Sequence, residues 1–228
     1  MEFIQISEHL HIPRIGYGPG IFDEIWADSS WSVINKIFKG KSLNTLGEYR
    51  RYKTLEKIIK DNETVMIDTS AAYGYAQTNI GHLLKDSKHS ENKIICTKLS
   101  SRDQMISGSN IRKSFYNSLQ RFNGKTIDIY LMHWPVEKNM VDVWRQMEEL
   151  YCEGFVKCIG VCNCTERQLD KILMKCTIKP MVNQIECHPL YNRVRLRAFC
   201  HKENINIMAY TPLARGGGGT TDCWITKD

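Results

Sequence analysis

The stretch TVMIDTSAAY, residues 64–73, decides the fold. Its apolar run at 65–67 breaks at Asp68 into small residues, and Tyr73 follows five positions after the aspartate. A short apolar run of this kind is typical of an inner strand in a parallel sheet whose two faces are both covered. We therefore predict a buried strand here, with Asp68 and Tyr73 just past its carboxyl end.

Five further segments of the same character follow, separated by stretches with helical periodicity. They are 93–99 (KIICTKL), 126–134 (TIDIYLMHW), 157–163 (KCIGVCN), 181–188 (MVNQIECH) and 206–211 (NIMAYT). Between the third and fourth, apolar residues recur at helical spacing from Met140 to Tyr151, and Gly154 marks the stop. Thr165 and Gln168 predict a capping box at the start of the next helix. Strands that alternate with helices imply right-handed crossovers and a parallel sheet.

The fold class that this alternation favours is α/β, of the (β/α)8 TIM-barrel type. Each unit has polar residues at the carboxyl end of its strand, and a barrel gathers all of those ends at one mouth, whereas an open doubly wound sheet does not. The residues expected at the mouth are Asp68, Lys98, His133, Asn163, Gln184 and Tyr210.

Length and charge limit the other function classes. A chain of 228 residues can bury one large core, and we find no sign of a second domain, so residues 1–228 are taken as a single domain. The formal net charge of +6 comes from scattered basic clusters such as 50–53 and 193–197, which lack an aromatic platform. We interpret them as solvated helix faces and expect no nucleic-acid partner.

The cysteine content and the amino-terminal residues indicate the cellular compartment in which the protein is expected. The nine cysteines are an odd number, and several lie in apolar strand segments, which favours reduced thiols in the cytoplasm. Cys158, Cys162 and Cys164 lack the spacing of a zinc site, so no metal is expected. No basic and apolar leader opens the chain, and no run approaches the roughly 18 apolar residues of a membrane span, so we expect no membrane association.

The segment before the first strand has less regular signals. Residues 1–20 are expected to form a small hairpin or cap that ends in the turn-forming run GYGPG at 16–20. This run superficially resembles a phosphate loop, but the strand and helix of a Rossmann unit do not surround it, and we reject that interpretation. Residues 21–45 are expected to be irregular, with Trp26 and Trp31 as packing anchors.

Four residues at the predicted mouth form a chemically coherent set. The phenol of Tyr73 titrates near ~10 in isolation, and a nearby Lys98 ammonium would favour the phenolate and lower that pKa. Asp68 would keep Lys98 charged and aimed, and a neutral His133 could orient a carbonyl oxygen toward the phenol. The set suits protonation of an alkoxide formed by carbonyl reduction, and the hydride would have to come from a cofactor because no side chain supplies one.

Several segments resemble the aldo-keto reductase family, in the family's order and over most of residues 64–216. They are IDTSAAYG (67–74), CTKL (96–99), SLQRFNGKTIDIYLMHWP (118–135), MEELYCEGFVKCIGVCN (147–163), VNQIECHPLYN (182–192) and MAYTPLARG (208–216). The resemblance implies a (β/α)8 barrel that binds NADP(H) without a Rossmann fold and reduces a small aldehyde or ketone to an alcohol.

The resemblance also implies residue roles. Tyr73 would be the general acid, Lys98 the partner that lowers its pKa, Asp68 the holder of Lys98 and His133 the residue that orients the substrate. Trp134 would line the substrate pocket.

The cofactor residues follow from the same resemblance. Asn163 and Gln184 would bind the nicotinamide carboxamide, and Tyr210 would stack on its ring. Cys162 stands where the family has a serine at the carboxamide, and Thr211 replaces another serine near the pyrophosphate. Leu213 is expected in the same cofactor-binding segment. Because a thiol is a poorer hydrogen-bond donor than a hydroxyl, Cys162 is expected to weaken cofactor binding.

Each of these residues also has an ordinary structural explanation. Asp68 could cap the next segment, Lys98 could extend from a strand end to the surface, His133 could be a satisfied barrel histidine and Tyr210 could be core. Two other functions stay open: a non-catalytic barrel that senses a nucleotide or binds a protein, and an isomerase or aldolase with Lys98 as a Schiff base. A monomer is expected.

The carboxyl-terminal end departs from the family pattern. Residues 216–228 resemble nothing in the family and are expected to be a disordered or non-family tail. Barrels of this class need about 250 residues, and the sequence supplies about six of the eight units. We therefore expect an incomplete barrel from a truncated chain, without the part that contacts the adenosine 2'-phosphate in the family.

Overall fold

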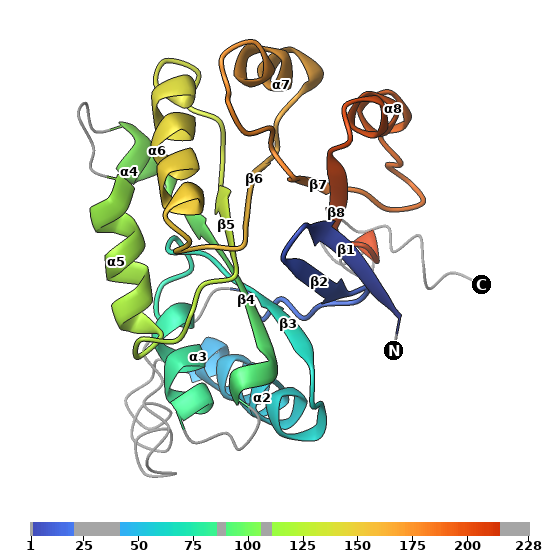
Figure 1. The fold of residues 1–228 in the computed structure, drawn as a ribbon. Helices are drawn as coiled ribbons and strands as arrows, with labels where there is room; N and C mark the ends of the chain where they lie inside the picture. Colours follow the sequence, from blue (N-terminus) through green and yellow to red (C-terminus); the bar gives the residue numbers. More distant parts are fainter. Residues whose placement is uncertain (1, 21–41, 86–89, 106–110, 215–228) are drawn as a thin grey trace.

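A computed structural model describes residues 2–20, 42–85, 90–105 and 111–214 (Figure 1). Most of this part of the chain forms a curled parallel sheet with helices along its outer side. The six strands pair in chain order and are β3 (Val65–Asp68), β4 (Lys93–Leu99), β5 (Ile129–Met132), β6 (Cys158–Cys162), β7 (Val182–Glu186) and β8 (Asn206–Tyr210). The predicted parallel sheet is confirmed.

The helices that connect these strands follow the predicted alternation. They are α2 (Ser42–Asp61), α3 (Ala76–Lys85), α4 (Ser101–Met105), α5 (Ile111–Arg121), α6 (Met140–Cys152), α7 (Glu166–Leu173) and α8 (Val194–Lys202), with a short 3₁₀ helix η1 (Ser90–Asn92) before β4. The capping box at α7 is confirmed, since the Thr165 side chain accepts from the Gln168 backbone and the Gln168 side chain accepts from the Thr165 backbone. Gly154 has a φ of 77° just after α6, as a helix stop requires.

The sheet has a core on each face. On the outer face, strand residues such as Ile95 and Tyr130 pack against helix residues such as Phe115 and Trp144. The inner face has its own buried cluster, which combines residues of the strands with residues of an amino-terminal hairpin. The hairpin contributes Ile6, Leu10 and Ile12, and the strands contribute Met66, Ile94, Cys96, Ile129, Leu131, Cys158, Cys162 and Val182. The two clusters explain why the strands read as continuous apolar runs.

The hairpin consists of β1 (Phe3–Ser7) and β2 (Leu10–Pro13), as expected for residues 1–20. The Ser7 hydroxyl donates to the Lys157 carbonyl at 2.7 Å, just before β6 begins. The chain then continues alongside β3, where Tyr17 pairs in parallel with Ile67. Residue 17 of the glycine-rich run is thus bonded to an edge strand, consistent with rejection of a phosphate loop.

The strands and helices differ in places from the predicted ranges. Residues 42–45 were expected to be irregular and are helical, because α2 already begins at Ser42. Five strands are shorter than predicted, among them β3, for which residues 64–70 were predicted. Pairing with the neighbouring strands does not extend to the residues at the ends of the predicted ranges. Trp26, Trp31 and the tail 216–228 lie outside the described residues. In the part of the chain that the structure describes, no helix is both long and apolar enough to cross a membrane.

Candidate active site

The candidate site lies where the inner face of the sheet reaches the carboxyl ends of its strands. Side chains two positions apart on a strand share a face. Asp68 follows Met66 at that spacing, and Lys98 follows Cys96 in the same way. The apolar inner face therefore continues directly into polar groups. The same spacing relates His133 to Leu131, Gln184 to Val182 and Tyr210 to Met208.

Lys98 is buried and fully bonded. Its side chain is 1% exposed, and its Nζ lies 2.7 and 2.8 Å from the two Asp68 carboxylate oxygens and 2.9 Å from the Thr69 carbonyl oxygen. These contacts use the three hydrogens of an ammonium group. Burial lowers the pKa of Lys98, but the charge of Asp68 outweighs it, so the pKa stays above its ordinary value. The group is a fixed cation.

The ring of Tyr73 contacts both the Lys98 ammonium and the His133 imidazole. The Lys98 Nζ lies 5.5 Å from the centroid of the tyrosine ring, and the rings of Tyr73 and His133 meet edge to face at 5.4 Å. Burial raises the pKa of the Tyr73 phenol, and Lys98, opposed by Asp68, does not offset it. The expected net fall in the Tyr73 pKa was therefore wrong, because desolvation exceeds the effect of an ammonium that is already neutralised by a carboxylate.

His133 is held on the site side of β5. Its backbone N–H donates to the Leu99 carbonyl at 3.2 Å, and its Nδ1 lies 3.0 Å from the Ser70 hydroxyl oxygen. Burial and the Lys98 charge, with Asp68 opposing, lower the pKa of His133 to about 4. The imidazole is therefore neutral at pH 7. Trp134, which is 51% exposed, lies beside it with a ring distance of 6.4 Å.

Asn163 connects three strand ends. Its backbone adopts the left-handed region at a φ of 59°, directly after β6. Its Nδ2 donates to the His133 carbonyl at 3.1 Å, and the Tyr210 hydroxyl donates to its Oδ1 at 2.9 Å. The side-chain amide of Asn163 thus links His133, which follows β5, to Tyr210 at the end of β8.

Gln184 and Cys162 form a second, more deeply buried pair. The Cys162 thiol donates to the Gln184 Oε1 at 3.8 Å, while the Gln184 Nε2 lies 2.9 Å from the Met208 sulfur. Burial raises the pKa of Cys162 well above its ordinary value, so the group is a neutral thiol. Its weak donor capacity is directed toward Gln184.

The last two candidates lie apart from this group. Thr211 has a φ of 47°, and its hydroxyl lies 3.4 Å from the Glu186 carboxylate. The Leu213 side chain is 71% exposed. Neither contacts the Lys98, Tyr73 and His133 cluster in the hydrogen bonds and ring contacts of the described residues.

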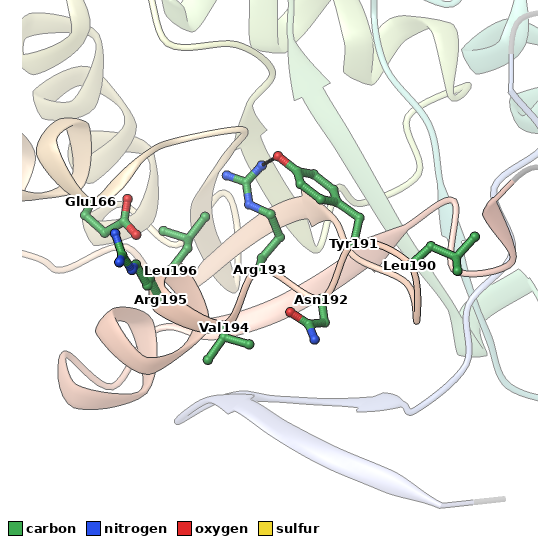
Figure 2. A pocket seen from close by; sticks show the side chains of 8 residues that line it. All are labelled: Glu166, Leu190, Tyr191, Asn192, Arg193, Val194, Arg195 and Leu196. Carbon is green, nitrogen blue, oxygen red and sulfur yellow. Dashed lines mark hydrogen bonds between the residues drawn. The ribbon is translucent and has the colours of Figure 1, made fainter.

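A surface pocket of about 390 Å³ lies in the connection from β7 to α8 (Figure 2). The Arg193 guanidinium lies against the Tyr191 ring there and donates to its hydroxyl at 2.7 Å. The pocket is lined by Glu166 and by the successive residues 190–196. None of the candidate site residues lines it.

Ser70 was not predicted as a site residue. It lies within the stretch 64–73, is fully buried and contacts His133. A serine between small residues carries no pattern that distinguishes it from a packing residue, so no signal in the sequence could have identified it.

Comparisons with known proteins give one consistent result. The sequence model described as Aldo/keto reductase family matches residues 37–220. Methylglyoxal reductase DkgA of Escherichia coli (strain K12) is 32% identical over 228 residues, which cover 99% of this chain and 72% of that protein.

Solved structures agree in fold. The crystal structure of an aldo/keto reductase from Brucella melitensis matches with a TM-score of 0.70 and 27% sequence identity. The match covers 93% of this chain and 73% of the Brucella chain. The crystal structure of a Gox0644 mutant in complex with NADPH matches with a TM-score of 0.68 and 28% sequence identity. The match covers 94% of this chain and 69% of the Gox0644 chain. The predicted (β/α)8 class, with about six units present, is confirmed.

Proposed function

The chain belongs to the aldo/keto reductase family, and on that premise we propose that it reduces a small aldehyde or ketone to the alcohol with NADPH as hydride donor. One observation carries the proposal: the buried Lys98 and Asp68 ion pair lies directly beside the edge-to-face pair of Tyr73 and His133. A small carbonyl compound such as methylglyoxal is the first substrate to test, because the bacterial relative is named for its reduction.

The amides of the site suit the carboxamide of a nicotinamide ring. A side-chain amide has two N–H hydrogens, and its oxygen has two lone pairs. The contact of Asn163 with His133 and the contact of Gln184 with Met208 each use one hydrogen. One hydrogen and one lone pair remain on each amide, which is what a carboxamide can bind. The aromatic face of Tyr210, held by Asn163, supplies a surface for the ring.

NADP(H), when bound, supplies the hydride that no side chain can provide. His133, neutral at pH 7, donates a ring N–H to the carbonyl oxygen and orients it. Tyr73 donates its phenolic proton to that oxygen as negative charge develops. Lys98, fixed by Asp68, stabilises the phenolate that is left, and the proton is replaced from water.

The raised pKa of Tyr73 agrees with this direction of transfer. A phenol that stays protonated across neutral pH can act only as a proton donor. An alkoxide is a much stronger base than a phenolate, so the transfer is downhill even when burial raises the phenol pKa.

A second candidate function is nucleotide binding without turnover. It is favoured by the hydrogen bonds of Lys98, which go to Asp68 and Thr69 and leave no ammonium hydrogen for Tyr73. In that case the barrel would keep the cofactor amides but lack effective proton transfer.

The test follows the absorbance of NADPH with methylglyoxal and with a series of larger aldehydes. We expect turnover by the natural chain and a fall of at least about 10²-fold in Tyr73→Phe. Tyr116→Phe, at a partly exposed tyrosine of α5, is the matched control and should retain full activity. NADPH binding seen by fluorescence without turnover of any aldehyde would replace this proposal with the second candidate.

A further inference from the structure

Ser70 lies between the first strand of the sheet and the candidate proton donor. It is fully buried, two residues past the end of β3 and three before Tyr73. Its backbone carbonyl accepts from the Tyr73 N–H at 3.1 Å, and its side-chain oxygen accepts from the Ala72 N–H at 3.1 Å. The turn therefore fixes the position of the Ser70 hydroxyl as well as that of the tyrosine.

Among the described residues, the hydroxyl hydrogen of Ser70 has one possible acceptor, the His133 Nδ1. The Ser70 oxygen already accepts from Ala72, and its other polar neighbour is the His133 Nδ1 at 3.0 Å. Among the residues that the structure describes, no other side chain or carbonyl accepts from this hydroxyl. If Nδ1 instead carried a proton, the buried hydroxyl hydrogen would have no acceptor among the described residues, which is a costly arrangement.

We propose that Ser70 is a positioning residue that holds His133 in one neutral tautomer, with the proton on Nε2. The Ser70 hydroxyl donates to Nδ1, so Nε2 on the far side of the ring carries the N–H that can bind a carbonyl oxygen. The role of that N–H rests on the proposed reductase function. The tautomer itself does not depend on it.

The other groups around His133 do not select a tautomer. Lys98 directs its hydrogens to Asp68 and Thr69, and its charge acts on the ring only through space. Asp68 is paired with Lys98, and Tyr73 meets the imidazole through its ring. The low pKa of His133, about 4, keeps the ring neutral at pH 7, where the choice of tautomer decides which nitrogen can donate.

The direct test is the ¹⁵N spectrum of the histidine rings in the full chain at pH 7, without added cofactor. The signals of His133 are assigned by their loss in His133→Gln. We expect a protonated Nε2 and an unprotonated Nδ1 in the natural chain, and a mixture of tautomers in Ser70→Ala. Ser118→Ala, which removes another buried hydroxyl at a distance from the site, should leave the His133 signals unchanged.

Activity and pH give a second readout. In Ser70→Ala the pKa of His133 should rise, because the hydrogen bond to the neutral ring is lost, with Lys98, Asp68 and Tyr73 unchanged around it. We expect a fall of about tenfold in kcat/KM, since the cost of one hydrogen bond is of the order of a factor of ten. Ser70→Thr, which keeps the hydroxyl, should recover the natural tautomer, and Ser118→Ala should keep full activity.

A natural chain with its proton on Nδ1, or an unchanged tautomer in Ser70→Ala, would overturn the assignment of Ser70. Absence of carbonyl reduction by the natural chain would instead remove the proposed function. The spectrum would still decide whether Ser70 controls the ring.

Discussion

The charge of Lys98 depends on a single carboxylate. In Asp68→Asn the buried ammonium loses its counter-charge while its burial is unchanged. We expect unfolding in urea to show a loss of about 3–5 kcal/mol, the usual cost of breaking a buried ion pair from one side. Asp142→Asn, at the exposed pair with Arg145, is the matched control and should show no measurable change. Equal stability of Asp68→Asn and the natural chain would contradict the view that this pair is buried and coupled.

His133 makes stability depend on pH. Its pKa is about 4 in the folded chain against 6.5 ordinarily, so between these values the unfolded chain binds more protons than the folded one. Stability contributed by the neutral ring is present above about pH 6.5 and is lost as the pH falls toward 4. His133→Gln should therefore reduce the fall in Tm between about pH 7 and about pH 4.5. A fall of the same size in both proteins would show that other groups cause it.

At the scale of residues, the sequence predicted which chemical groups converge but not their energetics. The convergence of strand carboxyl ends at one barrel mouth predicted Asp68 and Lys98 together, and they form an ion pair. The pKa of Tyr73 was predicted in the wrong direction, because desolvation depends on how much chain surrounds the ring. The contact of Ser70 with His133 could not be predicted either, because the two residues are 63 positions apart in the sequence.

Helix α7 is set by its amino-terminal cap. Thr165→Ala removes the oxygen that accepts from the Gln168 backbone and should destabilise the chain by about 1 kcal/mol in urea unfolding. Thr165→Ser keeps the acceptor and should recover most of that loss. If Thr165→Ser were as unstable as Thr165→Ala, the methyl group and not the cap would account for the effect.

Strands β6 and β7 approach each other closely at Gly160. A Cβ there would lie 2.5 Å from the Val182 carbonyl oxygen and 2.8 Å from a methyl carbon of Leu131. Because one of these atoms is backbone, Gly160→Ala should cost about 1–3 kcal/mol. Gly47→Ala, in α2 with nothing within 4 Å, should be neutral or stabilise by up to about 1 kcal/mol. Comparable midpoints for the two variants in urea would contradict this packing.

At the scale of elements, the sequence predicted the strands well and the helix ends less well. Buried strands are recognisable because both faces are covered, and β4 was predicted with its observed bounds. The start of α2 was missed because the residues before Tyr52 show little apolar periodicity, and Thr165 marked α7 only because a cap has a local signature. Strand ends depend on partners that are far away in sequence.

At the scale of the whole molecule, one curled sheet connects the two cores and the site. The inner cluster joins the hairpin to β3 through β7, and the site residues continue that cluster at the carboxyl ends. β8 is the least buried strand of the sheet. The sequence predicted this convergence from the alternation of strands and helices, since parallel strands must end at the same side.

The buried cysteines report on whether this sheet opens as a unit. They are distributed over distant elements: Cys96 in β4, Cys158 and Cys162 in β6, Cys164 just after β6, and Cys200 in α8. Burial raises the pKa of all five thiols, so each is both inaccessible and poorly nucleophilic in the folded chain. Cys152 is exposed and should react at once with a thiol reagent.

We expect mass spectrometry after alkylation in increasing urea to give one common midpoint for these five cysteines, equal to the midpoint of unfolding by circular dichroism. Cys152→Ser removes the reaction of this exposed thiol and should leave that midpoint unchanged. A cooperative sheet requires this coincidence, because no strand between β3 and β8 can separate without exposing both cores. Earlier labelling of Cys200 than of Cys96 would show instead that α8 and the adjoining edge of the sheet open independently of the strands that hold Lys98.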